Sequence, residues 1–261
     1  MHLVALVCRD PALSEALNAG KRPYHEFHLH PLPEVSDLAR VAAALEPLDF
    51  AGMLVLPGEL QEEAYRLATR SSLDAQEVGA ADALTVTPGG LIAEFNLGRA
   101  VGAALAHERW HAREASAVIL GGGVSARAVS RELSSMGVRH LTVIARHRPN
   151  AERVPPKLAA STEVTARAQG DPLSETLIMR ADLLVRIDAR LHIDPALLGP
   201  HLSVVDFSTE TLSPLRQQAM NLGAMSIGLR EVQAHQLALS LGHILGGRLD
   251  VGLFSEALHS L

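Results

Sequence analysis

The sequence contains one cysteine, Cys8, so no disulfide can form within the chain. Cys8 lies in the apolar run LVALVC, where a thiol is typically a small buried hydrophobic group. A chain without disulfides suits a reducing compartment. No apolar run approaches the roughly 20 residues that span a bilayer, and the start MHLVALVCRD is too short for a signal peptide. We therefore expect a cytoplasmic protein with no membrane partner.

Basic residues are scarce as well, with 23 Lys and Arg against 29 Asp and Glu and a formal net charge of −6. A general nucleic-acid binder needs a basic face, so we expect no nucleic-acid partner. Only two of the basic residues are lysines, Lys21 and Lys157. Hydrophobic residues, in contrast, make up 48% of the 261 residues, which is enough for one large domain or two modest ones.

Short apolar segments alternate with segments of helical spacing along the chain. Near-continuous apolar strands separated by helices indicate βαβ units and buried parallel sheets, and therefore an α/β fold. The expected strands cover 2–8, 24–33, 50–56, 116–120, 141–145, 163–168, 181–187, 202–207 and 223–229, with a hairpin over 83–96 that turns at 88–90. In the first half, the expected helices cover 11–20, 34–47, 59–72 and 97–111.

Two sets of such units predict two domains. We expect an N-terminal α/β domain of substrate-binding type over residues 1–100 and a Rossmann-type dinucleotide-binding domain over 101–231. Two helices over 232–261 are expected to pack back on the N-terminal domain. Ligands are expected in the cleft between the domains, as is common for such sites.

The segment ILGGGVSARAV, residues 119–129, carries the clearest motif. Gly121, Gly123 and Ala126 form the pattern G-x-G-x-x-A between a strand and a helix, as in dinucleotide-binding loops. Gly121 would make the tight turn, and Gly123 would let the backbone approach a pyrophosphate. Val124, Ser125 and the free N–H groups of the first helical turn would face the anion. The alternative is a glycine-rich turn that binds nothing.

The end of the next strand indicates which nucleotide would bind. An NAD site usually has Asp or Glu there for the ribose hydroxyls. This sequence instead has Arg146 and Arg148, whose guanidinium groups could contact a 2′-phosphate in bidentate fashion. We therefore expect NADP(H) as the cofactor. The alternative is that both arginines are solvated loop residues.

At this point the chain resembles the shikimate and quinate dehydrogenase family over nearly its whole length. The segments that carry the resemblance, in order, are FAGMLVLPGELQEEA, VGAADAL, GLIAEFN, ILGGGVSARAV, VIARHR and LSVVDFSTETLSPLRQQAMNLGAMSIGLREVQAHQ. Their order and spacing, rather than any one segment, support the likeness. The resemblance implies an NADP-dependent oxidoreductase that acts on a CH–OH group, in aromatic amino acid biosynthesis.

The sequence departs from that family where its chemistry takes place. The family's Lys would fall near Glu59 or Leu60, and its Asp is replaced by Gly98. A substrate-binding Asn becomes Asp82, and Arg186 stands at an Asn position on the nicotinamide side. The N-terminal S-x-S pair has no clear counterpart. What the resemblance leaves for substrate binding is Asn96, Gln233 and the altered Asp82.

Hydride transfer from an alcohol needs a base or a polarising donor beside the hydroxyl. The catalytic residues stay unassigned, with Glu59, Asp82 and Glu94 as weak candidates, because burial can turn a carboxylate into a base. The alternative for each is a solvated or ion-paired acid. We expect ordinary shikimate dehydrogenase activity to be weak or absent.

The histidines yield no expected metal site. His28 and His30 share a strand face, with His25 offset, but a polar strand face is the simpler interpretation. His107 to His111 match the bare H-E-x-x-H pattern, on what we expect to be a surface helix without a third ligand.

Three hypotheses remain open from the sequence. In the first, the chain is an NADP(H)-dependent oxidoreductase with an altered substrate or mechanism. In the second, it is a catalytically inactive dinucleotide-binding homologue that acts as a sensor or partner protein. The third is an ordinary shikimate dehydrogenase whose alignment around the Lys and Asp is wrong, which the two lysines disfavour. An unidentified small-molecule substrate is expected. The oligomeric state stays open, with a homodimer as one option.

Overall fold

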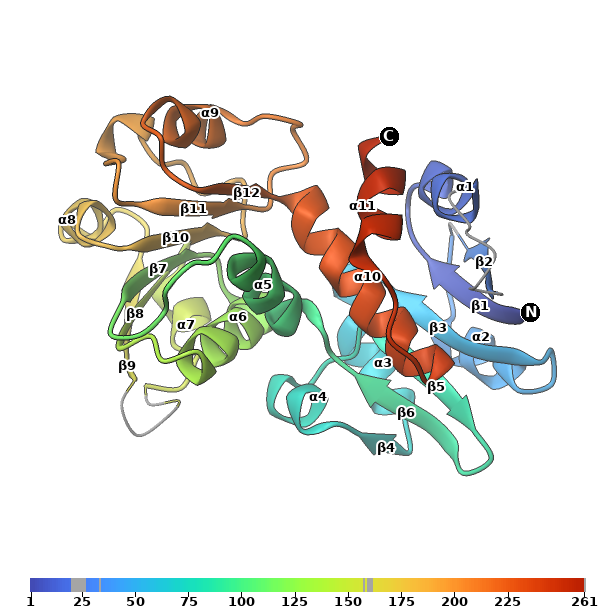
Figure 1. The fold of residues 1–261 in the computed structure, drawn as a ribbon. Coiled ribbons are helices and arrows are strands. Elements are labelled where there is room, and N and C mark those ends of the chain that lie inside the picture. Colours follow the sequence, from blue (N-terminus) through green and yellow to red (C-terminus); the bar gives the residue numbers. More distant parts are fainter. Residues whose placement is uncertain (20–26, 33, 157, 159–161, 261) are drawn as a thin grey trace. The chain divides into compact units, whose positions relative to one another are not determined.

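A computed structural model describes residues 1–19, 27–32, 34–156, 158 and 162–260 (Figure 1). His25, Lys21 and Lys157 lie outside the described residues. The chain divides into two compact units. Unit 1 consists of Met1–Leu97 and Gln233–Leu261, and unit 2 of Gly98–Val232. The divisions expected at residues 100 and 231 lie close to these limits.

Unit 1 contains a mixed six-stranded sheet with the strand order β2-β1-β3-β5-β6-β4. Its strands are β1 (His2–Val7), β2 (Phe27–Leu32), β3 (Phe50–Val55), β4 (Arg70–Ser71), β5 (Ala83–Thr87) and β6 (Gly90–Glu94). β1 pairs in parallel with β2 and β3, whereas β5 is antiparallel to both β3 and β6. The expected hairpin is confirmed: Thr87 pairs with Gly90, so Pro88 and Gly89 form the turn.

The helices of the first chain segment of unit 1 are α1 (Pro11–Ala19), α2 (Leu38–Leu45), α3 (Gln61–Leu67) and α4 (Leu73–Val78). The chain returns to unit 1 at Gln233, near the start of α10 (Leu229–Leu245), and continues into α11 (Val251–His259), which lies beside α1 (Figure 1). Side chains of α10 and α11, including Leu241 and Phe254, share one buried cluster with Val4, Leu6 and Leu29. The two C-terminal helices therefore complete the core of unit 1.

The expected helix over 59–72 is wrong at both ends. Residues Gly58–Leu60 form a short 3-10 turn before α3, and Arg70 and Ser71 form β4 instead of a last helical turn. β4 pairs in parallel with β6. Pairing with the edge of β6 therefore decides the conformation of Arg70 and Ser71, although their sequence pattern favours a helix. The side chain of Ser72 then accepts from the Ala75 N–H and begins α4, a helix that the sequence did not predict.

Unit 2 contains a six-stranded sheet in the order β12-β11-β10-β7-β8-β9, and every pairing is parallel (Figure 1). The strands are β7 (Ser116–Leu120), β8 (His140–Ala145), β9 (Glu163–Ala168), β10 (Leu183–Arg186), β11 (Ser203–Asp206) and β12 (Ser226–Gly228). Numbered within the unit, this is the Rossmann order 3-2-1-4-5-6. The predicted α/β fold with a Rossmann-type domain is confirmed.

The helices of unit 2 are α5 (Leu97–His107), α6 (Gly123–Ser135), α7 (Arg148–Ala151), α8 (Ser174–Met179) and α9 (Pro214–Asn221), followed by the start of α10. α5 ends at His107, four residues before the expected end, and Arg109 has a φ of 58°. His107 and His111 are therefore not on one helix, and the H-E-x-x-H interpretation fails on its geometry.

Two glycines let α5 approach α6 closely. A Cβ on Gly98 would lie 2.5 Å from the carbonyl oxygen of Ala128, and a Cβ on Gly102 would lie 2.3 Å from the Glu132 carboxylate. Both pairs are four residues apart on their helices, so they form one line of contact. Gly98 is thus a packing residue, and a side chain there would overlap the α6 backbone.

In β2 the expected strand face is observed: Phe27 and Leu29 are buried, His28 is half-buried and His30 is exposed. Among the described residues, no cluster of three or more His, Cys, Asp or Glu side chains could hold a metal ion. None of the described helices is long and apolar enough to cross a membrane.

Candidate functional site

The glycine-rich loop follows the central strand β7 of unit 2. Gly121 has a φ of 144°, and a Cβ on it would lie 3.0 Å from the Ile187 Cβ. Gly122 is the N-cap of α6, without a capping side chain, and lies against Asn150. Gly123 has a φ of 74° and its missing side chain faces open space. The loop therefore has the left-handed backbone and the unobstructed approach that an anion at a helix N-terminus requires.

The first turn of α6 lies directly behind this open space. Val124 and Ser125 are half-buried, and Ala126 is completely buried. The small side chain at Ala126 lets α6 lie close to the sheet, as the motif predicts. The structure thus brings together the glycines, Val124, Ser125 and Ala126 in one loop and the first turn of α6.

Two arginines follow β8, the strand next to β7. Arg146 is exposed and makes no hydrogen bond to any part of the chain that the structure describes. Arg148 begins α7, a helix that the sequence did not predict, and its Nε donates to Glu152 at 2.8 Å. Arg146 is therefore free to bind an anion, whereas Arg148 is partly neutralised by its own helix.

The loop after β10 closes the other side of the glycine loop. The N–H groups of Ile187 and Asp188 both donate to the Leu120 carbonyl, at 2.8 and 3.0 Å. The Asp188 carboxylate accepts from Arg190 Nε and Nη2 at 2.8 and 3.0 Å. Hydrogen bonds from Arg190, followed by the attraction of Arg190 and Arg146, hold the pKa of Asp188 below its usual value despite partial burial.

A pocket of about 360 Å³ opens at this same edge of the sheet. It is formed by residues at or after the carboxyl ends of four neighbouring strands: Leu120, Ile144, Gln169, Gly170, Asp171, Pro172, Ser174, Glu175, Ile178, Leu191, His192, Ile193, Asp194 and Leu197. Ligands of open parallel sheets bind at the carboxyl ends of the strands. The pocket therefore lies where a nucleotide is expected.

Asp82 lies at the centre of a buried polar cluster in unit 1. Its Oδ2 accepts from the Asn96 N–H at 2.8 Å, the Leu97 N–H at 3.1 Å and Gln236 Nε2 at 2.8 Å. Asn96 Nδ2 donates to Asp82 Oδ1 at 3.3 Å and to Ser240 Oγ at 3.0 Å. Asp82 thus caps the first turn of α5 and joins it to α10.

Asp82 is only 1% exposed, and burial raises its pKa to about 6 even though four hydrogen bonds act in the opposite direction. A base must reach the proton that it removes. With Oδ2 shared among three N–H donors, Asp82 has the geometry of a structural acceptor. The Oδ1 of Asn96 is buried and has no partner within the described part of the chain.

The other candidate residues of unit 1, which are Glu59, Glu94 and Gln233, are not members of this cluster. Glu59 is about half exposed and pairs with Arg9, which matches its alternative interpretation as an ion-paired acid. Glu94 is 19% exposed, and its Oε2 lies 3.8 Å from His243 Nδ1. Gln233 is half-buried and makes no hydrogen bond to the described residues.

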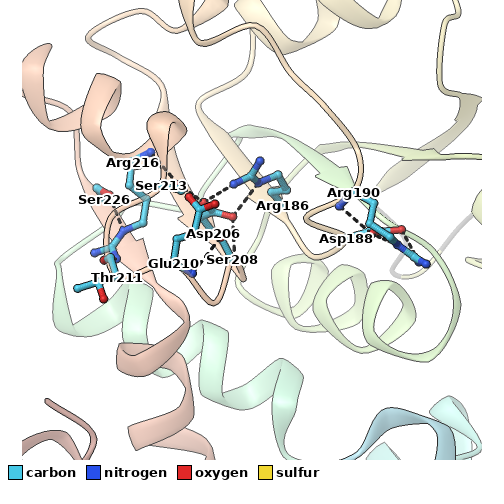
Figure 2. A network of polar contacts seen from close by, with 10 residues as sticks. All are labelled: Arg186, Asp188, Arg190, Asp206, Ser208, Glu210, Thr211, Ser213, Arg216 and Ser226. Carbon is cyan, nitrogen blue, oxygen red and sulfur yellow. Dashed lines mark hydrogen bonds and ion pairs between the residues drawn. The ribbon is translucent and has the colours of Figure 1, made fainter. Parts of the chain in front are cut away.

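A second polar network joins the carboxyl ends of β10 and β11 (Figure 2). Arg186 donates from Nε and Nη2 to the two oxygens of Asp206, at 2.8 and 2.6 Å. Asp206 also accepts from Ser213 Oγ and from the Ser208 N–H. Burial alone would raise the pKa of Asp206, but these donors and the Arg186 charge lower it below its usual value.

Sequence reasoning missed Gln236, Ser240, Asp206 and Asp188 as members of these networks. Gln236 is 154 residues away from Asp82, so no local pattern could connect them. Asp206 does give a signal, because it is a lone carboxylate at the end of the apolar run LSVVDF. A charge at that point of a buried strand requires a partner.

No family model matches the chain, but a curated relative and solved structures of similar fold are found. A shikimate dehydrogenase (NADP(+)) from Mesorhizobium japonicum is 28% identical over 233 residues, which cover 85% of this chain and 81% of the relative.

Two solved structures have the same fold over almost their whole length. Shikimate 5-dehydrogenase from Listeria monocytogenes, in complex with shikimate and NAD, has a TM-score of 0.87 at 18% identity and covers 99% of this chain and 96% of its own. Quinate dehydrogenase from Corynebacterium glutamicum, in complex with NAD, has a TM-score of 0.87 at 19% identity. The match covers 100% of this chain and 99% of the quinate dehydrogenase chain. The chain is therefore a homologue of shikimate dehydrogenase with the fold of the shikimate and quinate dehydrogenases.

Proposed function

We propose that the protein is an NADP(H)-dependent oxidoreductase of the shikimate dehydrogenase type with an altered substrate or mechanism. The observation that carries the proposal is the glycine loop. Gly123 faces open space in a left-handed conformation at the start of α6, and the exposed Arg146 follows β8, the strand paired with β7. NADP⁺ would accept the hydride from the substrate alcohol, or NADPH would return it in the reverse direction, and the chain's task is to bind the cofactor and to orient a substrate next to it.

The residues present fit this cofactor. The backbone at Gly121, Gly123, Val124 and Ser125 would hold the pyrophosphate. Arg146, and with less charge available Arg148, would hold the 2′-phosphate. The pocket lined by Gln169, Gly170 and Asp194 would take the adenosine, whose hydroxyl and amino groups are compatible with its carboxylates.

The cofactor proposal is tested by fluorescence titration with NADPH and NADH. We expect tighter binding of NADPH. Arg146→Asp should weaken NADPH binding about tenfold or more and spare NADH, because one charge-assisted contact contributes about 1.5–3 kcal/mol. Arg180→Asp is the matched control, because Arg180 is exposed and precedes β10 at the opposite edge of the sheet. Equal affinities for the two nucleotides in the unmodified protein would refute the preference.

The proposed change in chemistry is supported by the acids of unit 1. Asp82 is buried as a helix cap, Glu59 is paired with Arg9, and Gly98 packs against α6. Both lysines lie outside the described residues, and neither aligns with the family's Lys. In this arrangement Glu94, beside His243, is the acid with the fewest fixed hydrogen bonds among the three candidates.

The activity is tested by NADPH formation with millimolar shikimate and quinate, followed by a screen of hydroxy acids and cyclic polyols. We expect absent or very slow turnover with shikimate and turnover with another member of the screen. Shikimate turnover in the ordinary range of ~1–10³ s⁻¹ would contradict the altered chemistry. NADPH binding without turnover across the screen would favour the second candidate function, an inactive dinucleotide-binding sensor or partner protein.

A further inference from the structure

The Arg186–Asp206 ion pair lies at a distinctive point of the unit 2 sheet. Arg186 is the last residue of β10, and its register partners are Leu120 of β7 and Asp206 of β11. β7 and β10 are the two strands where the order of the sheet reverses, because β8 and β9 lie on one side and β11 and β12 on the other. In open parallel sheets this switch point is where ligands bind.

Arg186 belongs to the half of the sheet opposite Arg146. A dinucleotide binds across the switch point, with one mononucleotide on each half of the fold. Arg146 follows β8 in the first half, where the adenosine phosphate is proposed to bind. The second half consists of β10, β11 and β12, and the nicotinamide mononucleotide is expected to bind there.

The guanidinium of Arg186 is held in place with part of its donor capacity unused. It has five N–H groups, and Asp206 takes the one on Nε and one on Nη2. Nη1 has no hydrogen-bond partner among the described residues. The side chain is only 11% exposed. Figure 2 shows the guanidinium directed toward Asp206, with dashed lines from two of its nitrogens and none from the third.

Asp206 is fixed in turn by its own neighbours. It is completely buried and accepts from Ser213 Oγ, which also caps α9, and from the Ser208 N–H at 3.1 Å. The orientation of Arg186 is therefore set by β11 and α9 before any ligand arrives. A donor positioned in this way binds an oxygen without a large cost in side-chain entropy.

We propose that Arg186, positioned by Asp206, is a cofactor-binding residue that donates a hydrogen bond to the carboxamide oxygen of the nicotinamide ring. This assignment rests on the proposed function and adds a residue to the same site. The glycine loop and Arg146 hold the phosphates, and Arg186 would fix the orientation of the reactive ring.

The experiment compares three probes by calorimetric titration of the full-length protein. 2′,5′-ADP contains only the adenosine part, 2′-phospho-ADP-ribose adds the pyrophosphate and a ribose, and NADPH adds the ring. Arg186→Gln should weaken NADPH binding about tenfold, as expected for one lost charge-assisted hydrogen bond. The affinities for the other two probes should stay within about twofold. Arg139→Gln is the control, because Arg139 is an ion-paired arginine before β8, at the amino edge of the sheet.

A second variant separates binding from folding. Arg186→Gln leaves Asp206 buried without its cation, which destabilises a protein, whereas replacing both members by apolar residues is often tolerated. The double variant Arg186→Leu with Asp206→Leu should show the same selective loss of NADPH affinity. Its binding of 2′,5′-ADP also reports that unit 2 is folded.

Three outcomes would overturn the assignment: unchanged NADPH affinity, equal weakening of all three probes, or equal weakening of NADPH and 2′-phospho-ADP-ribose, which would place the contact on a phosphate. The proposed function fails separately, if the unmodified protein binds none of the three probes. Binding of 2′,5′-ADP by the unmodified protein, with no effect of Arg186→Gln on NADPH, contradicts the Arg186 assignment alone.

Discussion

At the scale of single residues, the structure gives the glycine at position 98 a packing role that the sequence does not reveal. The sequence alone suggests an aspartate that has been lost. In the structure, Gly98 touches the α6 backbone at a distance that leaves no room for a Cβ. Restoring a carboxylate there is therefore expected to damage the fold before it can affect chemistry.

This leads to a stability prediction for Gly98. Gly98→Ala and Gly98→Asp should lower the free energy of unfolding by about 1–3 kcal/mol or more, because the added Cβ overlaps the Ala128 carbonyl. Chemical denaturation measures the loss. Gly58→Ala is the control, since nothing lies within 4 Å of a Cβ at that position. Stability equal to the unmodified protein in Gly98→Asp would show that the two helices separate easily.

Asp82 predicts a pH dependence with a defined sign. Burial raises its pKa from 3.8 to about 6, so the folded state holds the proton more tightly than the unfolded state. The resulting stabilisation is present below the unfolded pKa and is lost as the pH rises through about 6. At 1.36 kcal/mol per pKa unit, the effect is about 3 kcal/mol.

The measurement is urea unfolding of the unmodified protein and of Asp82→Asn between pH 4 and pH 7.5. The stability of the unmodified protein relative to the variant should fall by about 2–2.5 kcal/mol across this range, because part of the effect is already lost at pH 4. Glu62→Gln, at an exposed carboxylate, should give no such trend. A constant difference between the unmodified protein and Asp82→Asn would show that Asp82 titrates normally.

At the scale of secondary-structure elements, α11 depends on its buried aromatic side chain. Phe254 is 2% exposed and lies in the unit 1 cluster with side chains of β1, β2 and α10. Phe254→Ala should lower the free energy of unfolding by about 3–5 kcal/mol, through lost apolar burial and the cavity left behind. Leu73→Ala, at a side chain that is 69% exposed, should change it by less than about 0.5 kcal/mol. A small loss in Phe254→Ala would mean that α11 contributes little to the core.

The elements that the sequence predicted well are those with strong local patterns. The apolar runs of β7, β8 and β9 agree closely with their predicted bounds, and the glycine loop lies between β7 and α6 as expected. β4 and α4 were missed because a two-residue strand depends on the edge of β6, and α4 has only six residues. Local reasoning also missed the cluster around Asp82, because Gln236 reaches it from the distant end of the chain.

At the scale of the whole molecule, the proposed nucleotide site lies entirely within unit 2. NADPH should therefore stabilise unit 2 by about 2.7 kcal/mol at a concentration of 100 times its dissociation constant. Amide hydrogen exchange, measured with and without NADPH, should slow most at residues 121–126 and 186–194. Protection confined to unit 1 would contradict the proposed location.

The discontinuous course of the chain through unit 1 has a consequence for biosynthesis. Unit 2 is one continuous segment, Gly98–Val232, whereas unit 1 needs both Met1–Leu97 and Gln233–Leu261. A nascent chain can thus fold unit 2 as soon as residues 98–232 have left the ribosome. At that time the apolar side chains of β1 and β2 are not yet covered by Leu241 and Phe254. Emergence of the segment from Gln233 onward, rather than emergence of the first half, sets the time at which unit 1 can fold. Until then, the first strands to be synthesised are the ones most exposed to aggregation and to chaperones.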